Sequence, residues 1–485
     1  MASPRSLHSL TSDFVAAQLA LRVRTINDVR LQPDGRYVLY WMQSTHRFED
    51  NWALRFAVLE ADRLNVPLLV HQGLDPTYEH ASDRIHSFII QNARELARRA
   101  PTFGLEYQFV LRRTRNDDRR VVDRLASRAT IVVTDDFPTC GIAARTARFA
   151  SRAPCRVVAV ESHCVVPSAH FDGKEEFAAR TIRPKLAKLR DLCLEPVEDR
   201  APRQRFDRAL LDGLDITPLA VGTLSDAALT AELARCEIDH SVPPVSTDHI
   251  VSGLTAARDR LADFTTFALE DYAERRNEPT DRDGSSRMSP YLHFGQISAA
   301  EVARAAIATG PAASVEKFLD ELITWRELSF NFCRLNPNHG KLRGLPDWVH
   351  RTMEAHKDDP REVQYTLAEL EEARTHEPLW NAAQRELQET GAIHNVVRMI
   401  WGKSVILWTP RYKTALDHLI LLNNKWGLDG RDPSSFGGIQ WCFGKFDRPW
   451  FDKPVWGVIR PMSIARAYEK FDADGYIARW RGASR

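Results

Sequence analysis

The sequence predicts two domains: an α/β domain built on a doubly wound parallel sheet, followed by an all-α domain. The chain has 485 residues, which is more than one ordinary domain holds. Short apolar runs alternate with helical patterns before residue 170, whereas helical periodicity dominates after residue 247. Ten of the 12 tryptophans lie from Trp325 onward, so the two parts also differ in composition.

Residues 1–36 form a polar arm in this interpretation, and residues 37–173 form the α/β domain. Apolar runs bounded by turn residues predict the strands, and the helices between them predict parallel crossovers. The predicted strands are 37–42, 66–71, 107–111, 130–133 and 156–160, and the predicted helices between them include 51–64 and 82–99. A sheet of this kind binds ligands at the carboxyl ends of its strands.

Residues 174–246 are charged, rich in proline and poorly periodic, which predicts a long inter-domain linker. Residues 247–485 form the predicted helical domain, because strand signals are nearly absent there. The predicted helices are 256–274, 299–309, 314–335, 367–374, 381–390, 393–407 and 412–424.

Composition narrows the classes of function. The net charge is only +1, which neither indicates nor excludes a nucleic-acid partner. Seven cysteines without a CxxC pair argue against a zinc site or a disulfide framework. The sequence has no GxGxxG or GxxxxGK[ST] motif, no long apolar span and no secretory signal. We therefore expect no metal and no membrane contact, and a protein of the cytoplasm or nucleoid, or of the nucleus in a eukaryote.

Tryptophan, arginine and asparagine fall at helical spacings between residues 380 and 450. Trp401 and Trp408 are seven residues apart, so two turns of one helix place both indoles on the same face. A row of indoles beside an arginine suits one-electron transfer to a redox cofactor. A tryptophan-rich helical core explains the same residues, and this pattern alone leaves both interpretations open.

Three other segments predict parts of a ligand site. The serine-rich loop 284–290 opens a helix, where free N–H groups bind phosphate or an ordinary cap forms. Residues 429–433 form an acidic turn able to bind ribose hydroxyls or to pair with an arginine. Glu321 and Trp325 are four residues apart on one helix face, and the next pair, Arg326-Glu327, is then expected to be exposed. Each segment also has a purely structural explanation.

Several sequence segments occur together and in a fixed order. They are YVLYWMQ (37–43) with EDNWAL (49–54), KEEFAARTIRPK (174–185), SPYLHFGQIS (289–298), DELITWREL (320–328), THEPLWNAAQ (375–384), LDGRDP (428–433) and GIQWCFGKFDRPW (438–450). With these segments the chain resembles the photolyase/cryptochrome superfamily, and within it the class II cyclobutane pyrimidine dimer photolyases. The resemblance covers nearly the whole chain.

This resemblance implies FAD bound within the helical domain. The residues implied to contact it are Tyr272, Ser285, Ser286, Met288, Ser289, Asn395, Arg398, Asn423, Asp429 and Asp432. Tyr272 and the serine loop would hold the phosphates and the ribityl chain. Arg398 would pair with Asp429 beside the isoalloxazine, and Asn423 would face flavin N5.

The resemblance also implies light-driven splitting of cyclobutane pyrimidine dimers in UV-damaged DNA. The residues that match the lesion pocket and the flipped-out dimer are Glu321, Trp325, Met399, Asn423 and Trp441. Those that match the electron-transfer chain, in order from flavin to surface, are Trp401, Trp380 and Trp408. The N-terminal sheet could hold an antenna chromophore of the deazaflavin type or a reduced flavin, or it could stand empty. No protein partner is implied, and we expect a monomer.

The chain departs from the family pattern at three places. It has Asn395 where family members typically have glycine, Ser434 within a segment that is commonly DPNGY, and Phe446 in place of a histidine. These departures motivate an alternative function, a non-repair photolyase-like protein or a cryptochrome-type light sensor. Such a flavoprotein would bind FAD without lesion-specific affinity for DNA.

Overall fold

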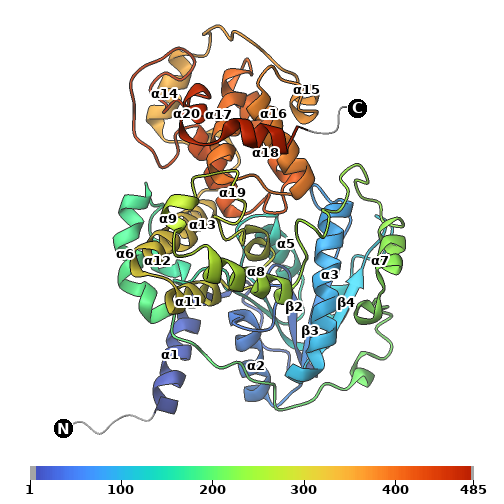
Figure 1. Cartoon of the computed structure of the whole chain (residues 1–485). Helices are drawn as coiled ribbons and strands as arrows, with labels where there is room; N and C mark the ends of the chain where they lie inside the picture. The colour runs from blue at the N-terminus through green and yellow to red at the C-terminus, as the bar shows by residue number, and fades with distance from the viewer. Residues whose placement is uncertain (1–6, 482–485) are drawn as a thin grey trace, which may run out of the picture.

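The computed structural model describes residues 7–481, and it confirms the predicted fold class (Figure 1). One six-stranded sheet lies in the N-terminal part, with strand order β1-β6-β5-β2-β3-β4. Its strands are β1 (Val23–Thr25), β2 (Tyr37–Met42), β3 (Leu68–Leu74), β4 (Glu106–Leu111), β5 (Ala129–Asp135) and β6 (Arg156–Val160). All neighbouring pairs are parallel except β1 with β6.

The central strand β2 is buried on both faces, as its uninterrupted apolar run predicts. Val38 and Tyr40 point to the face covered by α2 (Trp52–Leu64) and α3 (Asp83–Arg99). Tyr37, Leu39 and Trp41 point to the other face, where α4 (Val121–Ala126) and α5 (Ile142–Ala150) pack. The chain therefore winds outward in both directions from β2, which is the doubly wound arrangement.

The prediction of a polar arm over residues 1–36 is wrong for the described part. Residues 7–22 form helix α1 (Leu7–Arg22), and β1 pairs antiparallel with β6 at the sheet edge. Arg22 is buried, and its guanidinium donates to Glu161 Oε2 at 2.8 Å and to the main-chain oxygen of Val165 at 2.7 Å. Contacts with distant residues therefore order this segment.

Residues 174–246 hold more structure than a linker requires. They contain helices α6 (Ala179–Cys193) and α7 (Asp226–Leu233), joined by irregular chain and 3₁₀ turns. Helix α7 packs against α3 of the α/β domain, and α6 packs against the turn 320–325 of the helical domain. The segment thus wraps over both domains.

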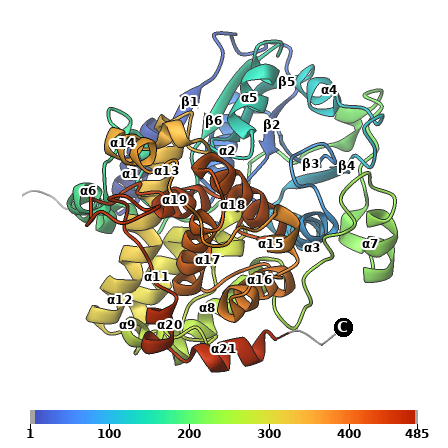
Figure 2. The ribbon, with the colours of Figure 1, turned by 90° about the horizontal axis from the view of Figure 1, so that it is seen from above.

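The C-terminal half is helical, as predicted. Its helices are α8 (Leu254–Phe267), α9 (Tyr272–Arg275), α10 (Ser289–His293), α11 (Ala299–Thr309), α12 (Ala312–Leu319), α13 (Arg326–Leu335), α14 (Asp347–Ala355), α15 (Leu367–Glu371), α16 (Pro378–Thr390), α17 (Asn395–Leu407), α18 (Tyr412–Trp426), α19 (Pro433–Cys442), α20 (Ala465–Lys470) and α21 (Ala473–Arg479). The predicted helix 256–274 is split into α8 and α9, and 314–335 contains a π turn at Asp320–Trp325. Helix α17 packs against α16, α18 and α19 near the centre of this domain (Figure 2).

Arg84, near the start of α3, connects the two domains. It is buried, and its guanidinium donates to the main-chain oxygens of Leu387 at 3.2 Å, Trp426 at 2.6 Å and Pro243 at 3.1 Å. Leu387 and Trp426 lie at the carboxyl ends of α16 and α18, where the carbonyl groups carry partial negative charge that attracts a cation. These bonds hold α16 and α18 against the sheet domain.

The prediction that Arg326-Glu327 is exposed is wrong, because α13 packs onto the loop after β6. Arg326 Nη1 donates to the main-chain oxygen of His163 at 2.6 Å, and Glu327 Oε1 accepts from the N–H of Val165 at 2.6 Å. Burial, together with the nearby Glu161, raises the pKa of Glu327 to about 8. Both side chains belong to the domain interface.

Glu327 predicts a pH dependence of stability. Its pKa is higher in the folded chain than in the unfolded chain, so the folded state binds more protons between about pH 4.5 and 8. The free energy of unfolding therefore falls as pH rises through this window, by up to about 4–5 kcal/mol. We expect Glu327→Gln to flatten this fall and to raise the melting temperature at pH 8. Thermal unfolding of the wild type and Glu327→Gln from pH 5 to 8 tests this prediction. Melting temperatures that depend on pH in the same way in both proteins would contradict it.

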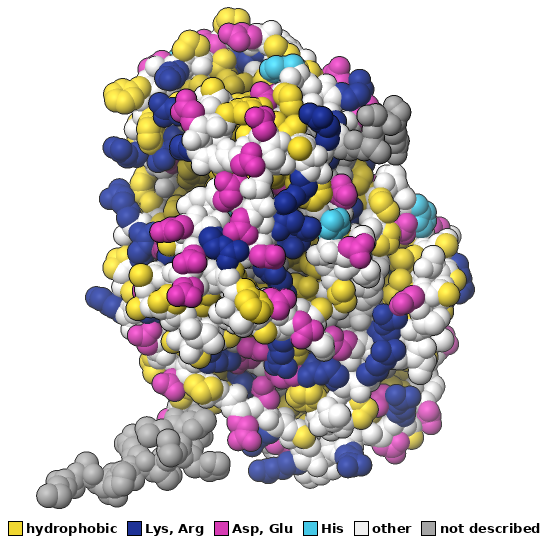
Figure 3. All heavy atoms as spheres, viewed as in Figure 1, with side chains coloured by type: hydrophobic (Ala, Val, Ile, Leu, Met, Phe, Trp, Pro, Cys, Tyr) yellow, Lys and Arg dark blue, Asp and Glu magenta, His cyan; other side chains and the backbone are white. Residues whose placement is uncertain are grey.

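Within residues 7–481, no helix is long and apolar enough to cross a membrane. On the face seen in Figure 3, acidic and basic side chains are interspersed. This mixture agrees with the small net charge of the chain.

Candidate functional site

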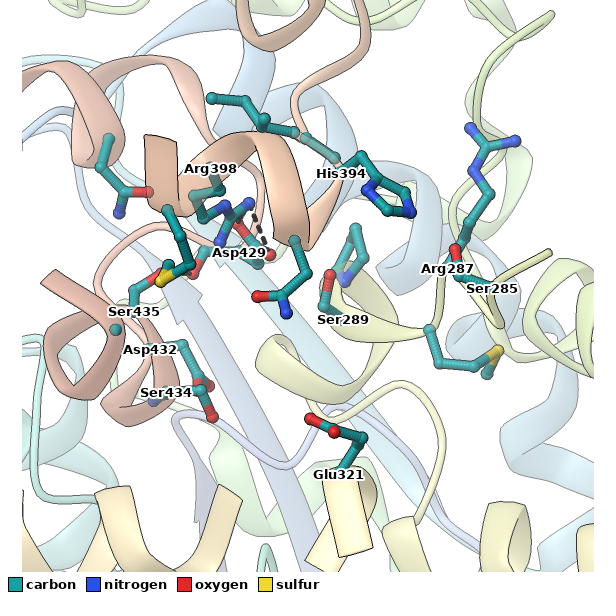
Figure 4. Close-up of a pocket in the computed structure, with 18 of the residues that line it drawn as sticks. Ser285, Arg287, Ser289, Glu321, His394, Arg398, Asp429, Asp432, Ser434 and Ser435 are labelled. Carbon is teal, nitrogen blue, oxygen red and sulfur yellow. Dashed lines mark hydrogen bonds and ion pairs between the residues drawn. The ribbon is translucent and has the colours of Figure 1, made fainter. Parts of the chain in front are cut away.

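A cavity inside the helical domain brings most of the predicted site residues together (Figure 4). The predicted residues that line it are Tyr272, Ser285, Ser286, Met288, Ser289, Glu321, Asn395, Arg398, Met399, Trp401, Asn423, Asp429 and Asp432. The four predicted residues outside this lining are Trp325, Trp380, Trp408 and Trp441. Residues that are more than 150 positions apart in the sequence thus surround one space.

The first turn of α17 supplies one wall. His394 is the N-cap, and Asn395 and Arg398 follow within the first turn, whose N–H groups carry partial positive charge. Arg398 Nη2 donates to Asp429 at 3.0 and 3.1 Å, as predicted from the resemblance. Arg398 Nε is buried and has no hydrogen-bond partner within residues 7–481. Because buried donors are usually paired, this atom is suited to a ligand.

The loop 284–290 forms the opposite end of the cavity. A Cβ on Gly284 would lie 2.8 Å from the main-chain oxygen of Arg275, so the loop packs tightly there. Arg260 holds the loop by donating to the main-chain oxygens of Ser285 at 2.8 Å and Ser286 at 3.1 Å. Arg287 adopts φ 56° and lines the cavity. This end is therefore basic and suits an anionic ligand such as a diphosphate.

Glu321 enters the cavity from below in the view of Figure 4. Its carboxylate is paired with Arg276 at 2.8 Å and Lys317 at 2.9 Å, so its charge is held in place at the cavity wall. Glu321 and Trp325 both belong to the π turn, where the wider backbone repeat changes side-chain directions relative to an α-helix. Both side chains are half-buried.

Met399 and Trp441 lie on two helices, α17 and α19, that contact each other. A Cβ on Gly438 would be 3.7 Å from Met399 Cε, so α17 and α19 meet closely there. Trp441, three residues further along α19, is half-buried, and its ring lies 5.0 Å from Lys403 Nζ. The indole is therefore partly exposed and also contacts a buried cation.

The tryptophan row predicted from sequence forms a continuous chain of rings. Trp401 lines the cavity, and Trp380 stacks on it with ring centroids 6.1 Å apart and planes 10° apart. The ring of Trp408 lies 5.6 Å from that of Trp380 and 5.3 Å from that of His376, which is exposed. The row therefore leads from the cavity to the protein surface.

The side chains of two predicted site residues, Asp432 and Asn423, already form hydrogen bonds within the protein. Asp432 is the N-cap of α19, where Oδ1 accepts from the N–H of Ser434 at 2.8 Å and Oδ2 contacts His293 Nδ1 at 3.2 Å. Asn423 is buried, and its Nδ2 donates to Asn424 Oδ1 at 3.2 Å. Both side chains still line the cavity.

Sequence reasoning missed several polar residues of the lining, among them Arg276, Arg282, Arg287, Glu386 and His394. Burial lowers the pKa of His394 to about 4, so its ring is neutral, and its Nδ1 has no partner in the described part of the chain. Burial raises the pKa of Glu386, which accepts from the Tyr476 hydroxyl. Most of these residues lie in loops or turns, where no periodicity marks them.

Comparison with known proteins identifies the family. The sequence profile described as DNA photolyase matches residues 38–203. The deoxyribodipyrimidine photo-lyase of Methanothermobacter thermautotrophicus is 35% identical over 463 residues, covering 96% of this chain and 98% of that protein. The chain belongs to the DNA photolyase family. The predicted membership of the photolyase/cryptochrome superfamily is thereby confirmed.

Solved photolyase structures share the fold. A bacterial class III photolyase from Agrobacterium tumefaciens superposes with a TM-score of 0.65 at 19% identity, covering 94% of this chain and 88% of that one. An archaeal photolyase from Sulfolobus tokodaii with two FAD molecules superposes with a TM-score of 0.64 at 18% identity, covering 91% and 89%. The sheet and helical domains described above therefore follow the photolyase architecture.

The departures from the photolyase pattern lie in different surroundings. Asn395 and Ser434 line the cavity, whereas Phe446 is buried against Phe332, with ring centroids 5.7 Å apart. Phe446 has φ 64°, in the left-handed region that is costly for a bulky residue. Phe446 thus belongs to the packing beneath α19, whereas Asn395 and Ser434 belong to the cavity lining.

Proposed function

We propose that the protein is a deoxyribodipyrimidine photo-lyase, a light-driven enzyme that splits cyclobutane pyrimidine dimers in UV-damaged DNA. The observation that carries the proposal is one cavity that joins a basic end, the Arg398–Asp429 pair, the carboxylate of Glu321 and the start of the tryptophan row. A relative of that name is 35% identical over almost its whole length.

The donor set of the cavity fits FAD. The arginines and serines around the loop 284–290 would hold the diphosphate, and Arg398 would face the flavin ring. The buried and unpaired Arg398 Nε, Arg276 Nε and His394 Nδ1 would find acceptors or donors on a bound cofactor. Reduced FAD, when bound, would supply one electron to the dimer under light and would receive it back after the ring opens, so that the overall splitting is redox neutral.

The side chains of this chain would provide binding and electrostatics. Trp325 and Trp441 would form aromatic walls for the flipped-out dimer, because a pyrimidine pair stacks well on indoles. Glu321 would hydrogen-bond the pyrimidine pair, and the cations Arg276 and Lys317 beside it would stabilise negative charge that develops there. Trp401, Trp380 and Trp408 would deliver electrons from the surface to oxidised flavin.

The experiment that tests the function is a repair assay. Purified protein, reduced chemically in the dark, is mixed with an oligonucleotide that contains one thymine dimer and is then illuminated with near-UV or blue light. We expect the dimer to disappear only in the light. Failure of the reduced, flavin-containing protein to repair this DNA would refute the proposal.

Glu321 gives a prediction within this site. We expect Glu321→Ala to retain FAD but to lower repair roughly 10- to 100-fold, because a charged hydrogen-bonding group is lost at the lesion. Flavin content and repair yield per absorbed photon measure the two effects. Glu316→Ala, which removes an exposed acid on the neighbouring α12, is the matched control. Wild-type repair by Glu321→Ala would remove Glu321 from the lesion pocket.

A light sensor is the second candidate function. Asn395 and Ser434 favour it, because both departures from the family pattern lie in the cavity lining. A sensor would bind FAD and undergo photoreduction without preferring damaged DNA. Binding measured side by side on dimer-containing and undamaged duplexes separates the two functions, since only the repair enzyme requires a preference.

We further propose a second chromophore of the deazaflavin type on the sheet domain. His71 in β3 and Gln108 in β4 are register partners on one sheet face, and both are buried. His71 Nδ1 and both polar atoms of the Gln108 amide have no partner in residues 7–481. Such groups suit a polar ligand. An absorption band of the purified protein besides those of flavin would support this antenna, and its absence would count against it.

A further inference from the structure

Lys403 is a buried lysine without a carboxylate partner in the described structure. It lies on α17, one turn beyond Met399, and is only 1% exposed. Its Nζ donates to the main-chain oxygens of Cys442 and Arg460, both at 2.7 Å. Both acceptors are neutral, and none of the ion pairs within residues 7–481 includes this ammonium. A buried charge of this kind is costly, so a compensating role is expected.

Two indoles surround the ammonium. Lys403 Nζ lies 5.0 Å from the ring centre of Trp441 and 5.2 Å from that of Trp456, within the range of cation–π attraction. The Arg460 guanidinium lies 5.6 Å from Trp441, but Asp447 neutralises it through two bonds of 2.7 and 2.9 Å. Lys403 therefore supplies the positive charge that remains beside Trp441.

The position of Lys403 also links three parts of the site. It joins α17, which carries Met399, to the carboxyl end of α19 at Cys442 and to the chain at Arg460. Lys403 is buried whereas Trp441 is half-buried, so the ammonium lies on the interior side of the indole. The exposed part of the indole is available to a stacking partner.

We propose that Lys403 is a positioning residue of the lesion pocket, which fixes the Trp441 indole from inside and places a positive charge behind the pyrimidine dimer stacked on it. The inference rests on the proposed function. Stacking on an indole whose orientation is fixed costs less ordering entropy than stacking on a mobile one. A cation behind the stack also favours a dimer that takes up negative charge, because screening by water is weak in the interior.

The surroundings of Lys403 make its charge sensitive to pH. Burial lowers the pKa of Lys403 to about 8. The charged or titratable groups that face it are Cys442 on α19, and Asp447 and Arg460 beyond that helix. Burial raises the pKa of the Cys442 thiol to about 11, and the Arg460 partner holds the pKa of Asp447 below its usual value. Between pH 7 and 9, Lys403 is the member of this group that changes charge.

The test compares wild-type holoenzyme with Lys403→Met, which keeps most of the side-chain length and removes the charge. Lys413→Met is the matched control, because Lys413 is an exposed lysine on α18. Dissociation constants are measured in the dark for a duplex with one thymine dimer and for the same undamaged duplex, at pH 7 and pH 9. The ratio of the two constants cancels general effects of pH on DNA binding.

We expect the wild-type preference for the damaged duplex to fall from pH 7 to pH 9. At pH 7 we expect the preference of Lys403→Met for the damaged duplex to be roughly three- to tenfold weaker than that of wild type. The preference of the mutant should be the same at pH 9 as at pH 7. Lys413→Met should follow wild type. A Lys403→Met preference equal to wild type at both pH values would overturn the inference.

Three further outcomes are decisive. If Lys403→Met does not fold, the wild-type profile decides, because a preference that does not change between pH 7 and 9 would overturn the role of the charge. If the wild-type protein repairs the dimer but Lys403→Met keeps the wild-type preference, only the role of Lys403 is refuted and the proposed function stands. Wild-type protein without any preference refutes the proposed function and this inference together.

Discussion

Replacing Trp401 by phenylalanine should nearly abolish photoreduction of oxidised flavin in this protein. Trp401 is the member of the tryptophan row that lines the cavity, and Trp380 stacks on it at 6.1 Å. Without the first indole, electrons from the surface have no readily oxidised side chain next to the cofactor, because phenylalanine is much harder to oxidise than tryptophan. Photoreduction is followed by the loss of oxidised flavin absorbance under blue light with an external reductant.

The same mutation should leave repair intact when the flavin is reduced chemically beforehand, because the dimer then takes its electron directly from the cofactor. Trp401 Nε1 donates to Gln384 Oε1 at 3.1 Å, so the mutation leaves one buried acceptor unpaired and costs about 1–3 kcal/mol of stability. Trp426→Phe is the matched control, because its indole donates to Glu371 at 2.9 Å and lies outside the row. Photoreduction of Trp401→Phe at the wild-type rate would show that the row is core packing.

Trp380→Phe and Trp408→Phe should slow photoreduction as well, since each removes one indole from the path to His376 at the surface. The sequence could predict only part of this tryptophan row. Trp401 and Trp408 share a helix face by spacing alone. Trp380 lies on α16, and only the packing of α16 against α17 places its ring between the other two.

The sheet could be predicted because local pattern and tertiary environment agree there. The run Tyr37–Met42 is apolar without interruption, and a strand covered on both faces has this composition. β1 could not be predicted, because a three-residue strand with exposed residues gives no signal of its own and forms by pairing with β6. Glu327 was placed wrongly for a related reason: its burial depends on Val165, which is distant in the sequence.

In the candidate site, too, some residues could be predicted from the sequence and others could not. Arg398 and Asp429 meet as the family resemblance implies, and the cavity gathers the serine loop with Glu321. Spacing within the sequence did not reveal Arg276, Arg287 or His394, which reach the cavity from turns or helix ends. Their contributions depend on burial and on unpaired atoms, which only the folded chain defines.

Replacing Arg398 by alanine should strip the protein of most of its flavin. The Arg398 guanidinium contacts Asp429 at 3.0 Å, and the side chains are only 18% and 9% exposed. Loss of the arginine removes a cation that faces the cofactor and leaves Asp429 as a buried, unpaired acid, which costs about 3–5 kcal/mol. Flavin per protein after purification and the melting temperature measure the two effects.

The double mutant Arg398→Ala with Asp429→Asn separates these causes. Removing the acid relieves the unpaired charge, so we expect the melting temperature to recover toward wild type. Flavin retention should stay low, because the cation that faces the cofactor is still missing. Arg398→Lys, which keeps the charge but cannot form the same two-pronged contact, should retain an intermediate amount of flavin. Full flavin occupancy in Arg398→Ala would show that the Arg398–Asp429 pair stabilises the fold and plays no part in binding the cofactor.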